Sequence, residues 1–270
     1  MPYTFLMKLF VFDVDGTLVA PSEHDIPKQE IKAMQALLDQ GHAIALASGR
    51  PLCSLMHHLS PLKGSRKYYI CSNGGATYDN GGNIIAETTL SYNDFVHLQK
   101  YASPNINVYG YEGKDKMVSL VYDKWIQLEE ELNLIEKKNI FILDGHSSNG
   151  HNAFQKIMIA GDPEYISKVI IDKEEERYEY SRSSPTFIEF LQKGSTKGKR
   201  VDDLRKYLSL KIEDVYCFGD QENDLSMIEP FVGVAVDNAI PKVKEASKYI
   251  TKSVSNHGVS YALKEILHII

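Results

Sequence analysis

Apolar runs and amphipathic segments alternate through the first 72 residues of the chain. Lys8 to Phe12, His42 to Ala47 and Tyr68 to Cys71 are short, nearly continuous apolar runs, which are typical of strands covered on both faces. Strand, helix, strand, helix, strand in this order predicts a parallel sheet with right-handed crossovers. The apolar residues at helical spacing are Ile31, Met34, Leu37 and Leu38 in the first intervening segment, and Leu52, Leu55, Met56 and Leu59 in the second.

The same alternation returns in the last part of the chain. After residue 196, amphipathic stretches again alternate with short apolar runs. Both ends of the chain are therefore expected to form one α/β domain. The elements expected here are a helix over Lys197–Leu208, a strand over Val215–Phe218, a helix over Glu222–Ile228, a strand over Phe231–Val236, and two helices that begin near Pro241 and Gly258.

The middle of the chain has a different pattern. Asn80-Gly81-Gly82 is a hairpin signal, and the strands and helices after it do not alternate regularly. We therefore expect an inserted α+β domain over residues 83–190, with residues 1–82 and 191–270 forming the other domain. Its expected elements are helix Asn93–Tyr101, strands Asn107–Tyr111 and Met117–Val121, helix Trp125–Lys137, strand Gln155–Ala160, helix Pro163–Asp172, and strands Tyr178–Ser181 and Thr186–Leu191.

The composition is that of an ordinary globular protein. Hydrophobic residues make up 43% of the chain and charged residues 24%, which excludes a disordered or fibrous protein. The formal net charge is −6 without any basic stripe, so we expect no nucleic-acid partner. The apolar runs fall far short of the roughly 20 residues needed to cross a bilayer, so we expect no membrane partner either.

The start of the chain and the cysteines bear on the compartment. The first residues lack the charged, apolar and small-residue zones of a signal peptide. Cys53, Cys71 and Cys217 are far apart and form no C-x-x-C pair, which is typical of free thiols. We therefore expect a cytoplasmic location.

Polar residues follow the expected strands at the points where these end. In a parallel sheet the ligand crevice lies beyond the carboxyl ends of the strands, so these side chains are expected to converge. Converging carboxylates repel one another unless a cation lies among them, and ligation by oxygen alone is typical of Mg²⁺. The residues are Asp13 and Asp15 after the first strand, Ser48 after the second, and Asp220, Asn223 and Asp224 after the strand that ends at Phe218.

Two familiar binding motifs do not fit the sequence. A calcium loop that began at Asp13 would have Leu18 at its sixth position, where Gly is needed, and His24 at its twelfth, where Glu is needed. Gly194 to Lys199 has three residues between its glycines instead of the four of a P-loop, and Arg200 stands where Ser or Thr is required. Both alternatives are therefore set aside.

Seven short segments form an ordered set along the chain. They are Asp13-Val14-Asp15-Gly16-Thr17-Leu18, Ser48-Gly49-Arg50, Asn73-Gly74-Gly75, Phe187-Ile188-Glu189, Lys197-Gly198, Gly219-Asp220-Gln221-Glu222-Asn223-Asp224 and Val236-Asp237-Asn238-Ala239. The first, second, fifth and sixth resemble the four motifs of the haloacid dehalogenase (HAD) superfamily, and the others are similar to its Cof-type branch of small-molecule phosphatases. The resemblance covers nearly the whole chain and implies a Rossmann-like HAD core with an inserted α/β cap that selects the substrate.

The resemblance implies chemical roles for two aspartates. Asp13 would be the nucleophile that forms an aspartyl-phosphate. Asp15 would protonate the leaving alcohol and then deprotonate the hydrolytic water. An acid at this position favours a phosphatase or a phosphomutase over the dehalogenases and transport ATPases of the superfamily.

The resemblance also implies a set of binding groups. Mg²⁺ would be held by the Asp13 carboxylate, the Asp15 main-chain carbonyl and Asp220, with Asp224 in the outer shell. The transferring phosphoryl group would be bound by Ser48, Gly49, Lys197 and Asn223.

The sequence therefore predicts a magnesium-dependent phosphatase. Its expected substrate is a small phosphorylated metabolite, such as a sugar phosphate or a phosphorylated cofactor. A phosphosugar mutase of the phosphomannomutase kind is the nearest alternative, because it shares the motif with two aspartates. A non-catalytic ligand sensor on the same fold is the alternative from another class.

Overall fold

The structure is a computed structural model that describes residues 6–21, 23–171 and 174–270. The chain divides into two compact units. The first, which we call the core unit, runs to Gly49, resumes over Leu55–Ala86 and closes with Thr196–Ile270. The second, the cap unit, comprises Glu87–Ser195 together with Arg50–Ser54. The sequence pattern placed this last short segment in the core, but in the structure it packs with the cap residues.

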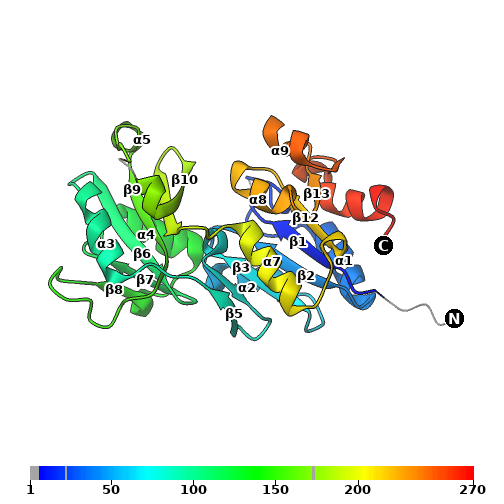
Figure 1. Ribbon diagram of the computed structural model, residues 1–270, viewed down its shortest axis with the longest axis horizontal. Coiled ribbons are helices and arrows are strands. Elements are labelled where there is room, and N and C mark those ends of the chain that lie inside the picture. Colours follow the sequence, from blue (N-terminus) through cyan, green and yellow to red (C-terminus); the bar gives the residue numbers. More distant parts are fainter. Residues whose placement is uncertain (1–5, 22, 172–173) are drawn as a thin grey trace. The chain divides into compact units, whose positions relative to one another are not determined.

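An eight-stranded sheet forms the centre of the core unit (Figure 1). The six strands from β14 to β3 are parallel, and β4 adds to β3 in the antiparallel direction. Leu9 in β1 is paired with Val215 on one side and Ala43 on the other, so the two ends of the chain share one sheet. Across the sheet the strands are β14 (Tyr249–Ile250), β13 (Val232–Ala235), β12 (Val215–Gly219), β1 (Leu9–Asp13), β2 (Ala43–Ala47), β3 (Lys67–Cys71), β4 (Ala76–Tyr78) and β5 (Ile84–Glu87).

The central strands β1, β2 and β3 are buried along their whole length. This explains their continuous apolar sequences, because strands of a parallel sheet are covered on both faces. The helices of the core unit are α1 (Lys28–Asp39), α7 (Lys197–Tyr207), α8 (Leu225–Ile228), α9 (Pro241–Ala246) and α10 (Gly258–Tyr261), with a π-helical turn over Ala262–Ile266 and 3₁₀ turns over Ser72–Gly74, Ile212–Asp214, Glu222–Asp224 and Val254–Asn256. The helix α2 (Leu52–Leu59) belongs to the core unit from Leu55 on and to the cap unit before it.

The cap unit contains a six-stranded sheet in which β7 and β8 form the parallel pair. Alternate residues of its central strand β9 face opposite sides: Ile157 and Ile159 belong to one apolar cluster, and Met158 and Ala160 to another. The cap sheet is therefore covered on both faces. Its strands in order are β10 (Tyr178–Ser184), β11 (Phe187–Gln192), β9 (Phe154–Gly161), β6 (Ile106–Glu112), β7 (Lys116–Ser119) and β8 (Ile140–Ile142).

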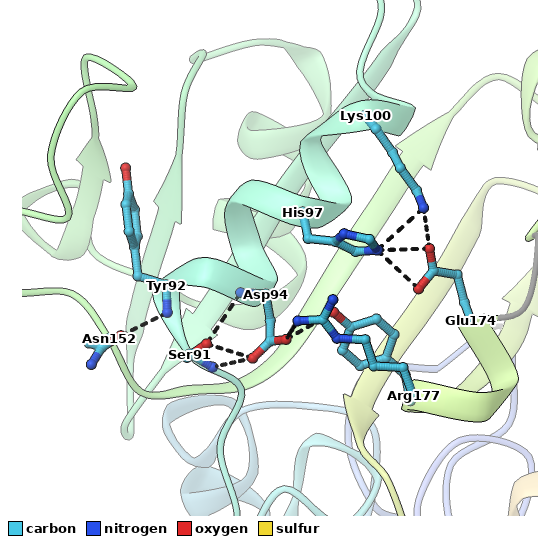
Figure 2. A network of polar contacts seen from close by, with 9 residues as sticks. Ser91, Tyr92, Asp94, His97, Lys100, Asn152, Glu174 and Arg177 are labelled. Atoms are coloured by element: carbon cyan, nitrogen blue, oxygen red, sulfur yellow. Dashed lines mark hydrogen bonds and ion pairs between the residues drawn. The ribbon is translucent and has the colours of Figure 1, made fainter.

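The helices of the cap unit are short and are held by polar contacts as well as apolar ones. Figure 2 shows His97 of α3 and Lys100 both directed at the carboxylate of Glu174 in α6. His97 Nε2 lies 3.0 Å from Glu174 Oε1. The Lys100–Glu174 ion pair thus joins two segments that lie more than 70 residues apart in sequence. The helices are α3 (Tyr92–Leu98), α4 (Lys124–Asn133), α5 (Pro163–Ile166) and α6 (Glu174–Arg177), with 3₁₀ turns over Gln99–Tyr101 and Lys137–Asn139.

The structure departs from the expected elements mainly in the cap unit. The helix expected over Trp125–Lys137 ends at Asn133, because Leu134 adopts a left-handed conformation with φ 55°. The helix expected over Pro163–Asp172 ends at Ile166, and residue 172 lies outside the described residues. The strands β8 and β14 and the helix α6 were not expected, since two to four residues are too few to show a period.

Cysteine chemistry agrees with the expectation. All three cysteines are free thiols, and Cys71 and Cys217 are buried.

None of the helices in the described ranges has the length and apolar character to span a membrane. Residues 1–5, on which the expectation about a signal peptide partly rests, lie outside the described residues.

Candidate active site

Three carboxylates from separate parts of the chain meet in the core unit. Asp13 is the last residue of β1, Asp220 follows β12, and Asp224 closes the 3₁₀ turn that comes next. Each of them offers one carboxylate oxygen to a group in which all oxygens lie within 4.8 Å of one another. They are also nearly inaccessible, with exposed fractions of 6%, 3% and 0%. The expected convergence at the carboxyl ends of the strands is therefore found for these three residues.

A buried lysine neutralises part of this charge. Lys197 is the first residue of α7, and its side chain is 1% exposed. Its Nζ donates to Asp13 Oδ1 at 2.6 Å and to Asp224 Oδ1 at 2.7 Å. Burial alone would disfavour the ammonium form, but the two carboxylates outweigh it and raise the pKa of Lys197. The lysine therefore stays charged and holds the two carboxylates in fixed positions.

Asp220 is oriented by neighbouring donors. The Thr17 hydroxyl donates to its Oδ1 at 3.1 Å, and Gln221 Nε2 donates to its Oδ2 at 3.1 Å. Asp224 in turn accepts the backbone N–H of Asp220 at 2.9 Å and that of Gln221 at 3.0 Å on Oδ2. Both oxygens of Asp224 thus have donors within the protein, which suits a supporting residue better than a direct metal ligand.

The electrostatics of the group are strongly perturbed. Burial, followed by the charge of Asp224, raises the pKa of Asp13 well above its ordinary value, although Lys197 counteracts this. Burial and Asp224 also raise the pKa of Asp220. Three carboxylates with one ammonium between them carry excess negative charge, and a cation among them would lower both pKa values again.

One carboxylate oxygen of Asp13, the candidate nucleophile, lacks a hydrogen-bond donor among the described residues. Asp13 Oδ2 is buried and receives no hydrogen bond from the described residues. A buried carboxylate oxygen without a partner costs free energy, and a divalent cation would satisfy it. Together with the clustered oxygens and the lack of nitrogen or sulfur ligands, this donor set fits a hard cation such as Mg²⁺.

The remaining residues of the expected site lie around the same strand ends. Asp15, two positions after β1, is exposed, and its backbone forms a bridge with Val19. Ser48 follows β2, is 2% exposed, and donates its N–H to the Ile70 carbonyl of the neighbouring strand at 2.9 Å. Asn223 is exposed on the 3₁₀ turn before Asp224. Asp15, Ser48 and Asn223 thus each follow a strand of the core sheet, β1, β2 and β12 respectively.

Sequence reasoning left three neighbours of the site without a role. Thr17 and Gln221 orient Asp220, and Asn73 accepts a hydrogen bond from Asn223 Nδ2 on its Oδ1 at 3.1 Å. All three lie inside motifs that the sequence shows, so their positions were visible. Their functions were not, because they depend on contacts between separate segments.

The family model of the haloacid dehalogenase-like hydrolases matches residues 10–263, which is nearly the whole chain. The chain belongs to this family. This confirms the resemblance, the fold class and the expectation of a hydrolase, which had rested on the seven segments. The membership alone names no cofactor or substrate.

Members and structures of the HAD-like hydrolases align with the chain over nearly its full length. It is 31% identical to YxeH of Bacillus subtilis (strain 168), a protein named for an inferred phosphatase activity, over 97% of this chain and 99% of that one. It is 25% identical to the 5-amino-6-(5-phospho-D-ribitylamino)uracil phosphatase YwtE of the same organism, over 97% and 98%. A solved HAD-like hydrolase from Bacteroides thetaiotaomicron superposes with a TM-score of 0.81 at 27% identity, over 97% and 100%.

Proposed function

We propose that this HAD-like hydrolase is a magnesium-dependent phosphatase that cleaves a phosphate monoester of a small metabolite, with Asp13 as the nucleophile. The observation that carries the proposal is the buried aspartate cluster with Lys197, in which Asp13 Oδ2 accepts no hydrogen bond from the described part of the chain. The name of the relative YwtE describes a phosphatase of a phosphorylated small molecule, which supports this substrate class. A sugar phosphate or a phosphorylated cofactor fits the same class.

The metal ligands in this proposal are the Asp13 carboxylate, the Asp15 main-chain carbonyl and Asp220, with Asp224 as support. Asp224 is assigned the supporting role because Lys197 and two backbone N–H groups already use its oxygens. When bound, Mg²⁺ would supply positive charge to the phosphoryl oxygens and keep Asp13 ionised. Asp15 contributes its main-chain carbonyl to the metal, and its side chain is assigned to proton transfer.

In the first half of the proposed reaction, a carboxylate oxygen of Asp13 attacks phosphorus. A bond forms between this oxygen and phosphorus, and the bond between phosphorus and the alcohol oxygen breaks. Asp15 in its acid form gives its proton to the departing alcohol oxygen. Lys197 holds Asp13 Oδ1 at 2.6 Å, which fixes the carboxylate in one orientation during the attack.

In the second half, water attacks phosphorus of the aspartyl-phosphate. Asp15, now a carboxylate, takes a proton from this water as the new bond forms. The bond between Asp13 and phosphorus breaks, which restores the carboxylate and releases inorganic phosphate. Both ionisable groups thus return to their starting states.

The proposed binding groups for the phosphoryl oxygens are Lys197, Ser48, Gly49 and Asn223. Lys197 supplies a full positive charge, while the Ser48 hydroxyl, the Gly49 N–H and the Asn223 amide supply neutral donors. They come from α7, from the end of β2 and from the turn after β12. Such donors stabilise the charge on the transferring group and fix its direction.

The test is phosphate release from p-nitrophenyl phosphate and from a panel of sugar and cofactor monophosphates, with Mg²⁺ or with EDTA. We expect release only with Mg²⁺, and a loss of at least about 1,000-fold in Asp13→Asn, because an amide is a far weaker nucleophile. Asp39→Asn, at an exposed position in α1, is the matched control and should match the wild type. The substrate with the highest kcat/KM in the panel defines the substrate class.

Two results would contradict the proposal. Release that persists in Asp13→Asn would exclude Asp13 as the nucleophile. No release from any compound by a folded wild type would exclude phosphatase activity on this class, and a requirement for a sugar bisphosphate activator would then point to phosphoryl transfer between sugars.

A further inference from the structure

The turn Ser72–Gly74, directly after β3, has an unusual backbone. Its three residues have consecutive positive φ angles of 53° at Ser72, 52° at Asn73 and 105° at Gly74. Residues other than Gly rarely adopt this conformation, and two in succession need support from their surroundings. Ser72 and Asn73 are buried, with exposed fractions of 0% and 7%. The surrounding structure therefore holds this turn in place.

Asn73 contacts the segment that follows β2. Its backbone N–H donates to the Ser48 carbonyl at 3.0 Å. Its amide nitrogen lies so close to Gly49 that a Cβ on that glycine would be 3.0 Å from it. The side chain of Asn73 thus packs directly on the backbone of Ser48–Gly49, two of the residues to which we assign phosphoryl binding.

Asn73 also contacts the turn that follows β12. Asn223 donates from Nδ2 to Asn73 Oδ1 at 3.1 Å, across 150 residues of sequence. Asn223 is exposed, so this bond restrains an amide that would otherwise rotate. A carboxamide nitrogen has two hydrogens, so donation to Asn73 still allows Asn223 to donate to a phosphoryl oxygen.

The next residue of the turn meets the start of α7. A Cβ on Gly74 would lie 2.4 Å from the carbonyl carbon and oxygen of Thr196 and 3.0 Å from the backbone nitrogen of Lys197. Arg200 of α7 donates from Nε to the Gly74 carbonyl at 2.8 Å. The turn therefore touches the helix start that carries Lys197, and only glycine permits this approach with φ 105°.

From these contacts we infer that Asn73 is a positioning residue for catalysis. The turn it centres is the one element that contacts all three groups of phosphoryl ligands, Ser48–Gly49, Asn223 and the helix start at Lys197, among the contacts described above. Its amide sets the spacing between Ser48–Gly49 and Asn223. The inference rests on the proposed function, because it concerns the geometry of the phosphoryl site. A displacement of about 1 Å in such groups lowers rates by up to about 100-fold.

The first test is Asn73→Gly, which removes the amide but keeps the left-handed backbone accessible. We expect kcat/KM for p-nitrophenyl phosphate to fall about 10- to 100-fold, and inhibition by inorganic phosphate to weaken by a similar factor. The Mg²⁺ concentration for half-maximal activity should change less than about twofold, because the contacts of Asn73 described above are with Ser48–Gly49 and Asn223, which we assign to phosphoryl binding. Ser209→Gly, another left-handed residue of the core unit but exposed, is the matched control and should leave all three quantities unchanged.

Two further variants separate positioning from a general loss of structure. Asn73→Asp has the same shape and still accepts from Asn223, but it brings a negative charge next to the bound anion, so phosphate inhibition should weaken at least about 10-fold. It also serves if Asn73→Gly does not fold. In an Asn223→Ala background, Asn73→Gly should cost less activity than in the wild type, because part of its effect passes through Asn223.

The outcomes distinguish the inference from the proposed function. If the wild type releases phosphate and Asp13→Asn does not, while Asn73→Gly and Asn73→Asp both stay within about twofold of the wild type, the inference is wrong and the proposed function stands. Equal losses from Asn73→Gly with and without Asn223 would also overturn it. If the wild type and Asp13→Asn do not differ, the proposed function itself fails, and the inference with it.

Discussion

Single residues in the core unit show how burial changes ionisation. Glu30, in the first turn of α1, is 2% exposed, and its Oε2 accepts the backbone N–H of Ser260 in α10 at 2.6 Å. Burial raises the pKa of Glu30 to about 7, because the hydrogen bonds from Ser260 and Val259 offset only part of the desolvation. In the unfolded chain the pKa returns to its ordinary value of 4.5. Between pH 4.5 and about pH 7, Glu30 therefore binds its proton more tightly in the folded state than in the unfolded state.

This difference predicts how stability depends on pH. Because the folded pKa is the higher one, the free energy of unfolding is greatest below pH 4.5 as far as Glu30 is concerned, and it falls as the pH rises to 7. The loss amounts to about 3 kcal/mol over that window. Glu30→Gln cannot ionise, so we expect it to be more stable than the wild type at pH 8 and to lose this advantage towards pH 5. Urea unfolding at both pH values measures the effect.

The exposed Glu245 of α9 provides the control. Glu245→Gln should follow the wild type at every pH, since its carboxylate stays in water in both states. If the free energy of unfolding differs between Glu30→Gln and the wild type by the same amount at pH 5 and pH 8, the ionisation of Glu30 is not coupled to folding.

At the scale of elements, the stability of a short helix depends on the hydrogen bonds at its ends. The helix α3 begins with a capping box: Ser91 Oγ accepts the Asp94 N–H at 3.2 Å, and Asp94 Oδ2 accepts the Ser91 N–H at 2.8 Å (Figure 2). The other oxygen of Asp94 accepts from Arg177 at 2.6 Å and from the Tyr178 hydroxyl at 2.9 Å. One carboxylate thus caps α3 and joins it to the α6–β10 segment.

Removing this carboxylate should destabilise the cap unit. Asp94→Ala leaves several donors without an acceptor, and we expect a loss of about 2 kcal/mol in the free energy of unfolding. Asp162→Ala is the matched control in the same unit, because Asp162 precedes α5 without a side-chain capping hydrogen bond and its ion pair with Lys124 is exposed. Its cost should stay below about 0.5 kcal/mol. Equal costs in the two variants would show that the capping box contributes little.

At the scale of the whole molecule, the core unit brings together acidic residues that lie far apart in sequence. Asp13 and Asp220 lie more than 200 residues apart in sequence, yet they share one cluster with Asp224. A ligand that binds only the folded state adds to its stability. Cation binding should therefore stabilise the assembled core unit.

Thermal unfolding with and without Mg²⁺ measures this effect. At about 100 times its Kd, Mg²⁺ should add about 2.7 kcal/mol, which corresponds to a rise in Tm of several degrees. Asp220→Asn should abolish most of the rise, whereas Asp39→Asn should preserve it. A rise of the same size in Asp220→Asn would mean that the cation binds elsewhere.

Local signals along the chain were reliable where elements are long and buried. The strands β1, β2, β3 and β12 and the helix α7 lie within one or two residues of their expected bounds. Periodicity failed where an element has too few residues to show a period, as in β8 and α6, and where a residue in the left-handed conformation ends a helix early, as at Leu134. In the cap unit the expected helices over Trp125–Lys137 and Pro163–Asp172 end early, at Asn133 and Ile166, and these are the largest differences in bounds.

The sequence by itself determined the family, the parallel sheet and the identity of the polar residues at the strand ends, because spacing and hydrophobic period are local properties of the chain. Only the tertiary structure decided which of these residues touch. The bridge of Lys197 between Asp13 and Asp224 and the contacts of Asn73 with Gly49 and Asn223 depend on segments far apart in sequence. Burial sets the charge of such groups, and burial exists only once the chain has folded.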